Sequence, residues 1–257
     1  LVTEPAFLRF AARRLMGASV GSLETVGEVE DIHPPEERGG DPATFLPGQV
    51  EKVEGVAFEG IESQLDIALG RRRTVRGIRR SVIREALVFN GSVFAKGQRL
   101  FLSPERDVPP AKDGPDYEEG FGCSSMVGCH FFGHWLRDDC ASMLLDEPGP
   151  RLDLGWPGWQ DGDFYGSQFG LSATAVRYAR VKRLILVEDI HQNSHKAERF
   201  RTLRARVAAH GTPRPGPIVY LARGGGTARN YENEAEVIDL LAARGVDIVR
   251  TESSPTP

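Results

Sequence analysis

The 257-residue sequence has few cysteines, no long apolar run and no surplus of basic residues. Its three cysteines, Cys123, Cys129 and Cys140, are too few for a disulfide framework, so we expect a reducing, cytoplasmic environment. No segment approaches the roughly 18 apolar residues that a membrane-spanning helix needs. The formal net charge of −4 argues against general nucleic-acid binding, because polyanions attract basic surfaces.

What the sequence does contain is typical of a globular α/β protein. Hydrophobic residues make up 40% of the chain and charged residues 26%, which is enough apolar material for one large or two small domains. In residues 1–105 we expect an irregular segment followed by a β-hairpin. The hairpin is predicted at residues 81–102, where Val- and Phe-rich runs flank Asn90-Gly91, a pair typical of type I′ turns.

Residues 106–211 are predicted to form a first Rossmann-like domain. After a Pro-rich loop, apolar residues recur at helical period and predict an amphipathic helix over about 128–147. A strand at 183–188 and a helix at 195–211 follow, and this alternation is α/β in character.

Pro-rich residues 212–217 are the predicted boundary of a second domain. Beyond them we expect a strand at 218–222, a Gly-rich loop, a helix that ends near Gly245, and the start of another strand. This is one βαβ unit, the incomplete beginning of a second Rossmann-like domain over residues 217–257.

The segment GCHFFGHWLRDDC, residues 128–140, carries the strongest chemical signal. His130, His134 and Asp138 are spaced by four, so they are expected on one face of a helix. Imidazole and carboxylate groups aligned in this way suit a general base, which takes a proton from an attacking hydroxyl near neutral pH. The alternative is the polar face of an ordinary helix.

The same stretch also allows a zinc site, and with it a zinc-dependent hydrolase. The ligands would be His130, His134 and Asp138, or Cys129 and Cys140, all of which zinc accepts. Against this interpretation, a zincin helix has glutamate directly after its first histidine, where this sequence has phenylalanine, and no paired CxxC exists.

The loop after the strand at 218–222 could bind a diphosphate. Glycines let a phosphate approach the backbone, arginines bind its oxygens in pairs, and a helix N-terminus offers free N–H groups. The candidate residues are Arg223, Gly224, Gly225, Thr227 and Arg229. The alternative is a flexible turn with solvated arginines, since the loop has neither the GK[ST] ending of a Walker loop nor a GxGxxG pattern.

Arg72, Arg76, Arg80 and Arg84 share a four-residue spacing that could form a basic face for nucleic acid or anionic lipid. Because interleaved aromatic residues are missing and the chain is acidic, a solvated face is favoured and no nucleic-acid partner is expected. Peripheral association with a membrane stays open.

Two further patterns lie in one Gly- and Trp-rich segment. Asp161-Gly162-Asp163 has the form of a cation-binding DxD motif, but Asp and Gly are also common in turns, and we favour a turn. Nearby aromatic residues could stack on sugar rings in a non-catalytic glycan-binding module, although packing in a core is the favoured interpretation. They are Trp156, Trp159, Phe164 and Tyr165.

Two segments taken together resemble glycosyltransferase family 61, the enzymes of capsular and other surface polysaccharide assembly. The first hallmark is a GHW segment with an acidic residue further along the same helix, matched by Gly133, His134, Trp135 and Asp138. The second is an arginine at a strand end, another about six residues later, and Asn-Glu opening a helix. It is matched by Arg223, Arg229, Asn233 and Glu234.

The resemblance implies a GT-B architecture of two facing Rossmann-like domains. It also implies an inverting hexosyl- or pentosyltransferase that moves a sugar from a nucleotide-sugar co-substrate to a glycan acceptor, with no tightly bound cofactor and no metal. His134 would be the base and Asp138 its orienter or the base instead, while Arg223 and Arg229 would stabilise the leaving diphosphate. The family's later Gly/His-rich segment would fall beyond Pro257, so we expect a fragment, whose activity by itself stays open.

Overall fold

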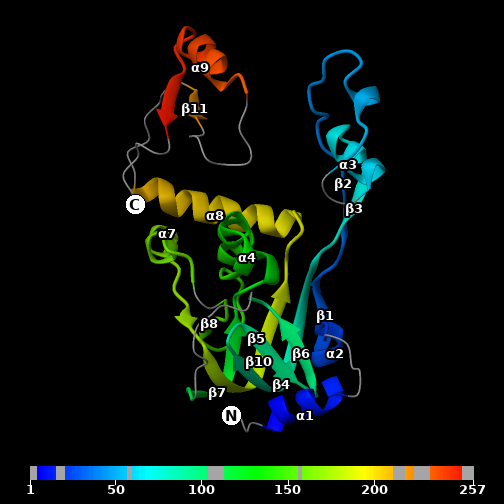
Figure 1. The fold of residues 1–257 in the computed structure, drawn as a ribbon, viewed down its shortest axis with the longest axis vertical. Coiled ribbons are helices and arrows are strands. Elements are labelled where there is room, and N and C mark those ends of the chain that lie inside the picture. Colours follow the sequence, from blue (N-terminus) through cyan, green and yellow to red (C-terminus); the bar gives the residue numbers. More distant parts are fainter. Residues whose placement is uncertain are drawn as a thin grey trace. The chain divides into compact units, whose positions relative to one another are not determined.

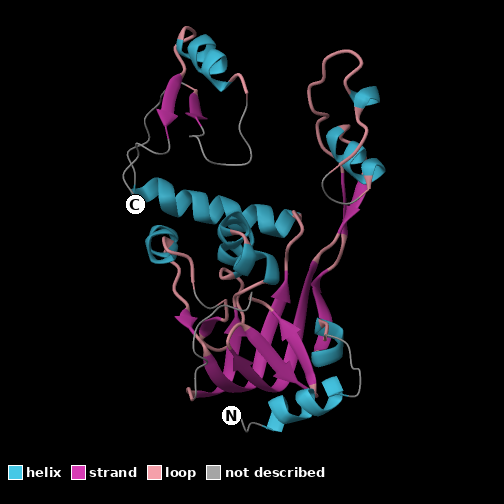
Figure 2. Ribbon diagram, in the orientation of Figure 1, coloured by secondary structure: helices cyan, strands magenta, loops and turns pink. Residues whose placement is uncertain are grey.

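The computed structural model describes residues 5–15, 21–56, 60–103, 113–155, 158–210, 218–222 and 232–250. The chain forms two compact units, residues 1–205 and 206–257. As predicted, it is an α/β protein (Figures 1 and 2). The arrangement of two facing Rossmann-like domains stays a prediction.

A mixed sheet is the centre of the first unit. Its strands follow the order β6-β5-β4-β10-β7-β8-β9, and β1 pairs with the other end of β4. β4 is antiparallel to β1, β5 and β10, whereas β10, β7, β8 and β9 are mutually parallel. The bounds are β1 Glu28–His33, β4 Ile78–Phe89, β5 Ser92–Ala95, β6 Gln98–Phe101, β7 Asp116–Gly122, β8 Arg151–Asp153, β9 Thr174–Ala175 and β10 Tyr178–Glu188.

The predicted hairpin is confirmed as β4 and β5, but its second run is divided, because the chain turns again at Lys96-Gly97 to form β6. Asn90 and Gly91 between them have φ values of 42° and 73°, the positive values that a type I′ turn requires at both positions. β4 also pairs with β10 from Phe89↔Tyr178 to Arg79↔Glu188. This pairing joins residues on both sides of the predicted boundary near residue 105 into one sheet.

The prediction of an irregular N-terminal segment was wrong for part of its length, because α1 (Pro5–Leu15), α2 (Leu23–Val26) and β1 lie there. β1 escaped detection because its first four residues are all exposed, so the strand lacks the apolar alternation that marks a buried face. A second antiparallel pair, β2 (Glu36–Arg38) and β3 (Arg73–Val75), is separated in sequence by short helices. These helices are the 3₁₀ turn η1 (Val50–Lys52) and α3 (Ile61–Ala68).

The core lies on both faces of the sheet, and β10 contributes to each. Leu184 and Leu186 belong to one apolar cluster and Ile185 to another, since successive residues of a strand point to opposite faces. A strand buried on both faces has an almost continuous apolar sequence, here LILV. Met143 and Leu145, which follow the helical segment after β7, pack into the second cluster.

The helical segment between β7 and β8 is broken, whereas a single helix over 128–147 was predicted. Phe131 has an extended backbone (φ −134°, ψ 116°) that ends α4 and precedes α5. The chain then forms one π-helical turn, η2, before α6. The bounds are α4 Met126–His130, α5 Phe132–His134, η2 Trp135–Asp139 and α6 Cys140–Ser142.

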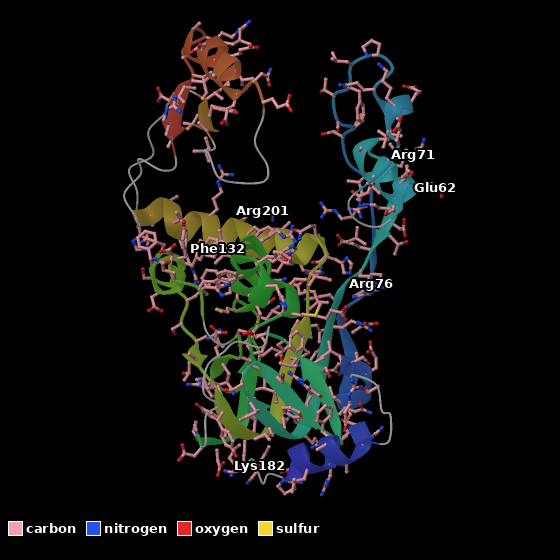
Figure 3. The ribbon with its side chains drawn as sticks, in the orientation of Figure 1. Glu62, Arg71, Arg76, Phe132, Lys182 and Arg201 are labelled. Atoms are coloured by element: carbon pink, nitrogen blue, oxygen red, sulfur yellow. The ribbon has the colours of Figure 1, made fainter. Side chains whose placement is uncertain are left out.

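α4 and α8 (Ser194–His210) lie near the end of the sheet where β7 and β10 finish (Figure 1). Phe132 lies at this end, and Lys182 of β10 lies at the opposite end (Figure 3). α8 confirms the predicted helix at 195–211 to within a residue at each end, and α7 (Gly162–Phe169) connects β8 to β9. Within the described residues, no helix is both long and apolar enough to cross a membrane.

The second unit confirms the predicted βαβ. β11 (Val219–Ala222) and β12 (Asp247–Arg250) are parallel, and α9 (Glu234–Ala242) connects them. The predicted boundary at 212–217 lies outside the described residues.

Two glycines near the helix break give a test of the packing. A Cβ on Gly128 would lie 2.0 Å from Asp139 Oδ2, whereas a Cβ on Gly133 would meet nothing within 4 Å. We expect Gly128→Ala to lower the free energy of unfolding by about 1–3 kcal/mol through overpacking. Gly133→Ala should raise it by about 0.5–1 kcal/mol, because alanine favours helix. Urea denaturation measures both, and equal effects of the two substitutions would contradict the packing described.

Candidate functional site

The candidate site lies where the parallel strands β7 and β10 end side by side. The chain leaves β7 toward β8 and β9 on one side, and then returns to form β10 on the other side of β7. Ligands of α/β proteins bind at such switch points, beyond the carboxyl ends of the strands. Functional side chains are therefore expected on the segments that follow β7 and β10.

His134 and Asp138 meet at this end of the sheet. His134 Nδ1 lies 2.8 Å from Asp138 Oδ2, and the side chains are 37% and 2% exposed. Asp138 belongs to the π-helical turn η2, a rare distortion found frequently at functional sites. An Nδ1–H that donates to Asp138 leaves the Nε2 lone pair as the proton acceptor of a half-exposed imidazole.

His130 does not share this face, contrary to the prediction. Because Phe131 interrupts the helix, His130 lies at the end of α4, where its Nδ1 is 2.7 Å from Met126 O. The described residues contain no cluster of three His, Cys, Asp or Glu side chains that could hold a metal ion. His130 is therefore not brought together with His134 and Asp138 as a third zinc ligand.

The cysteines do not offer a second set of ligands. Cys129 and Cys140 are buried, and burial raises the pKa of the Cys140 thiol to about 12. Burial also raises the pKa of Cys129 far above its usual range. A thiol must ionise to bind zinc, and these surroundings oppose ionisation.

Several donors converge on the Asp138 carboxylate. Lys196 Nζ donates to Oδ1 at 2.7 Å, Arg137 donates to both oxygens at 3.1 and 2.9 Å, and Gln192 Nε2 lies 3.5 Å from Oδ1. Arg137 Nη2 is also 3.0 Å from His134 Nδ1, but a protonated Nδ1 cannot accept its hydrogen. Burial alone would raise the pKa of Asp138, yet the hydrogen bonds from Arg137, Lys196 and His134 outweigh it and lower that pKa. Asp138 is therefore an ionised partner for the imidazole.

A further layer of buried charge supports Lys196. Its Nζ also donates to the carbonyl of Asp189, whose carboxylate pairs with Arg199. Asn193 accepts from Lys196 N at 2.8 Å and donates to Asp189 Oδ1 at 3.3 Å. Burial raises the pKa of Asp189, against the opposing effect of Lys196 and Arg199.

Sequence reasoning missed this layer. Lys196, Arg199 and Leu203 are the buried residues of α8. Their spacing of three and four is that of a core-facing stripe, but charged residues at such positions indicate a solvated face. Only the acidic partners, Asp138 after β7 and Asp189 after β10, reveal that this stripe is buried.

Asp139, next to Asp138, has a structural role. Ser125 donates to it from its backbone N at 3.2 Å and from Oγ at 2.6 Å, and the same Oγ accepts from Gly128 N to cap α4. Burial raises the pKa of Asp139 well above its usual value, beyond what the Ser125 hydrogen bonds can offset. The carboxyl group thus fastens the start of α4 to η2.

The arginine series, the DGD sequence and the described aromatic residues near it lie outside the elements that contain His134 and Asp138. Arg76 precedes β4, and Arg80 and Arg84 lie on it, where Arg80 pairs with Glu30 and Glu147. Asp161 occupies the position before α7, and Asp163 lies in its first turn. The glycan-binding alternative rested partly on Trp156, which is outside the described residues.

The predicted donor-side residues are only partly described. Arg223, Gly224, Gly225, Thr227 and Arg229 lie outside the described residues. Asn233 precedes α9 without a side-chain cap, and Glu234 Oε1 accepts from Tyr220 Oη of β11 at 3.2 Å. Glu234 thus fixes the start of α9 against β11, while the role of the loop stays a prediction.

Comparison with known proteins identified a matching family model. Residues 132–257 match the family model described as Glycosyltransferase 61, a range that contains His134, Asp138, Lys196 and the whole second unit. No curated protein and no solved structure matches the chain.

The raised pKa of Asp139 predicts how stability changes with pH. The folded protein keeps the carboxyl proton of Asp139 at pH values where the unfolded chain has lost it. The contribution of Asp139 to the free energy of unfolding therefore declines as the pH rises above about 4. The side chain in the Asp139→Asn variant cannot ionise. The free energy of unfolding of this variant should therefore rise relative to that of the wild type as the pH increases. Urea denaturation between about pH 4 and 8 measures this difference, and a difference independent of pH would contradict the assignment.

Proposed function

Because the chain belongs to glycosyltransferase family 61 through residues 132–257, we propose that it is an inverting glycosyltransferase. It moves a sugar, a hexose or pentose, from a nucleotide-sugar donor to a glycan acceptor in the assembly of surface polysaccharide. The observation that carries the proposal is the half-exposed His134, paired with buried Asp138 where β7 and β10 end.

In this reaction His134 is the general base. Its Nε2 takes the proton of an acceptor hydroxyl as the acceptor oxygen bonds to the anomeric carbon. The bond from that carbon to the donor phosphate breaks on the opposite face, and the electron pair leaves with the nucleoside diphosphate. Displacement from the opposite face inverts the anomeric carbon.

Asp138 is better suited to orient the base than to act as one. A carboxylate that is 2% exposed and hydrogen-bonded to Lys196, Arg137 and His134 has a lowered pKa and little access to an acceptor. It holds the Nδ1–H tautomer and stabilises the imidazolium that forms. This is the division of roles seen in His–Asp pairs that activate hydroxyl nucleophiles.

On the donor side, Arg223 and Arg229 supply the positive charge. The first turn of α9 contains two carboxylates, Glu234 and Glu236, which weaken the attraction of the helix N-terminus for phosphate. We therefore assign neutralisation of the leaving diphosphate mainly to the two guanidinium groups, which bind phosphate oxygens in pairs. No tightly bound cofactor takes part in this proposal, and the nucleotide sugar is a co-substrate.

Replacing the base should separate transfer from binding. We expect His134→Ala in the full-length protein to lower kcat for nucleotide release with acceptor present by about 10²–10⁴. Its affinity for the nucleotide sugar, measured by calorimetry, should stay that of the wild type.

His130→Ala is the matched control, because it removes an imidazole from the same stretch of chain but not from the Asp138 pair. It should retain nearly full activity. Equal activity of the His134 variant and the wild type would refute the assignment of the base. A wild-type protein that releases no nucleotide from UDP-, GDP- and CMP-sugars would argue against the function itself.

Replacing a donor-side arginine should have the converse effect. We expect Arg223→Ala to weaken nucleotide-sugar binding by about tenfold or more, the loss of one charge-assisted pair of hydrogen bonds. Arg244→Ala, at the far end of α9, is the control that keeps the loop intact. Calorimetry compares the two, and wild-type affinity in the Arg223 variant would remove the diphosphate assignment.

A further inference from the structure

A pocket of about 330 Å³ lies beside the helical segment that contains His134. Trp135 and Cys140 of that segment and Met143, which directly follows it, line the pocket together with the end of β8, the start of α7 and the chain that leads to β9. This volume is at the lower end of the range for small-molecule sites, roughly 300–1,000 Å³. Nothing in the proposed transfer step uses the pocket.

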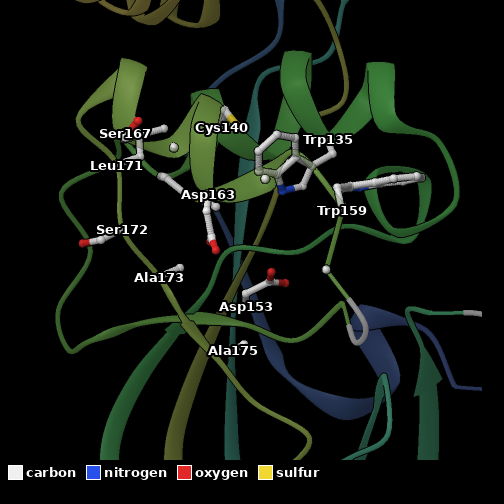
Figure 4. A pocket seen from close by; sticks show the side chains of 14 residues that line it. Trp135, Cys140, Asp153, Trp159, Asp163, Ser167, Leu171, Ser172, Ala173 and Ala175 are labelled. Atoms are coloured by element: carbon white, nitrogen blue, oxygen red, sulfur yellow. The ribbon is translucent and has the colours of Figure 1, made fainter. Parts of the chain in front are cut away.

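Two indoles form one side of the pocket, Trp135 and Trp159 (Figure 4). Phe132 holds both, stacked on Trp135 at 5.7 Å between ring centroids and edge-on to Trp159 at 5.6 Å. Trp159 Nε1 also donates to Gly128 O at 3.0 Å. The aromatic side is therefore fixed before any ligand enters.

Two carboxylates, Asp153 and Asp163, lie in the space that the indoles and the chain before β9 surround (Figure 4). Asp153 Oδ1 accepts from Ser124 Oγ at 2.7 Å and from Gly155 N at 2.9 Å, which orients the group. Among the described residues, the Asp163 carboxylate and the Ser172 hydroxyl have no hydrogen-bond partner. These groups are available to a ligand.

We propose that this pocket binds one neutral sugar unit of the glycan acceptor, an inference that rests on the proposed function. Indoles present flat apolar surfaces to the C–H faces of a sugar ring, and carboxylates accept hydrogen bonds from its hydroxyls. Two carboxylates repel a diphosphate or an acidic sugar, so the pocket does not serve the nucleotide. A cation is disfavoured, since no third acidic or imidazole ligand joins the pair among the described residues.

The pocket adjoins the base through the chain itself. Trp135 directly follows His134, Cys140 follows in the same helical segment, and Met143 comes directly after the end of that segment. A sugar ring held there anchors the acceptor to the segment that presents the base, while another ring of the acceptor is the one that reacts. Loss of the anchor should therefore raise KM for the acceptor and leave kcat for donor hydrolysis by water unchanged.

The test uses the full-length protein and intrinsic tryptophan fluorescence, a signal that includes the emission of Trp135 and Trp159. The probes are the neutral methyl glycosides of glucose, galactose, mannose and N-acetylglucosamine, with glucuronic acid and glucose 6-phosphate as acidic probes. We expect at least one neutral glycoside to bind, the acidic probes not to bind, and Asp163→Asn to weaken binding by about tenfold.

Asp161→Asn is the matched control, because Asp161 belongs to the same DGD sequence but neither lines the pocket nor caps α7 with its side chain. It should bind as the wild type does. The inference is overturned if no neutral glycoside binds, if the acidic probes bind equally well, or if both variants behave alike. Binding of Mn²⁺ that Asp163→Asn abolishes, without glycoside binding, would overturn it in favour of a cation site.

Donor hydrolysis without acceptor separates this inference from the proposed function. Nucleotide release by the wild type and Asp163→Asn at equal rates, with glycoside binding lost in the variant, supports both. If the protein releases nucleotide but binds none of the neutral glycosides, the proposed transferase function stands and the assignment of the pocket is overturned. Glycoside binding without any nucleotide release makes this pocket part of a glycan-binding module and overturns its assignment as an acceptor site.

Discussion

The buried pair of Lys196 and Asp138 is the interaction on which the site depends. It ties the helical segment after β7 to α8 after β10, and both side chains are almost completely removed from water. Removing one partner of such a pair strands a charge in the interior, at a cost of about 3–5 kcal/mol. The pair thus connects the carboxyl ends of two central strands and keeps Asp138 ionised next to His134.

The sequence predicted the parts of the fold that local rules control. Asn90-Gly91 marked a hairpin because few other residue pairs adopt positive φ at two positions in succession. The apolar run of β10 and the helix α8 were found for the same kind of reason, since a buried strand and a long helix are regular over many residues. The βαβ of the second unit could be predicted because two apolar strands flank one amphipathic helix in the sequence.

What could not be predicted depends on contacts distant in sequence. Phe131 breaks a helix that periodicity alone would continue, so His130 departs from the face of His134. The pairing of His134 and Asp138 itself agrees with their spacing of four, even though the turn between them is π-helical rather than α-helical. The lysine that meets Asp138 lies 58 residues further along the chain, where no local pattern distinguishes it from a surface residue.

This separation has a consequence for biosynthesis. Asp138 leaves the ribosome long before Lys196, and the chain between them contains β8, β9 and all of β10. Until β10 has paired with β7 and α8 has formed, the carboxylate has no buried counter-ion and keeps its water shell, because an isolated ionised group is costly to bury. The nascent chain therefore cannot close this region stepwise from its N-terminus. We therefore expect the end of the sheet that carries His134 to be completed late, when the segment with Lys196 arrives.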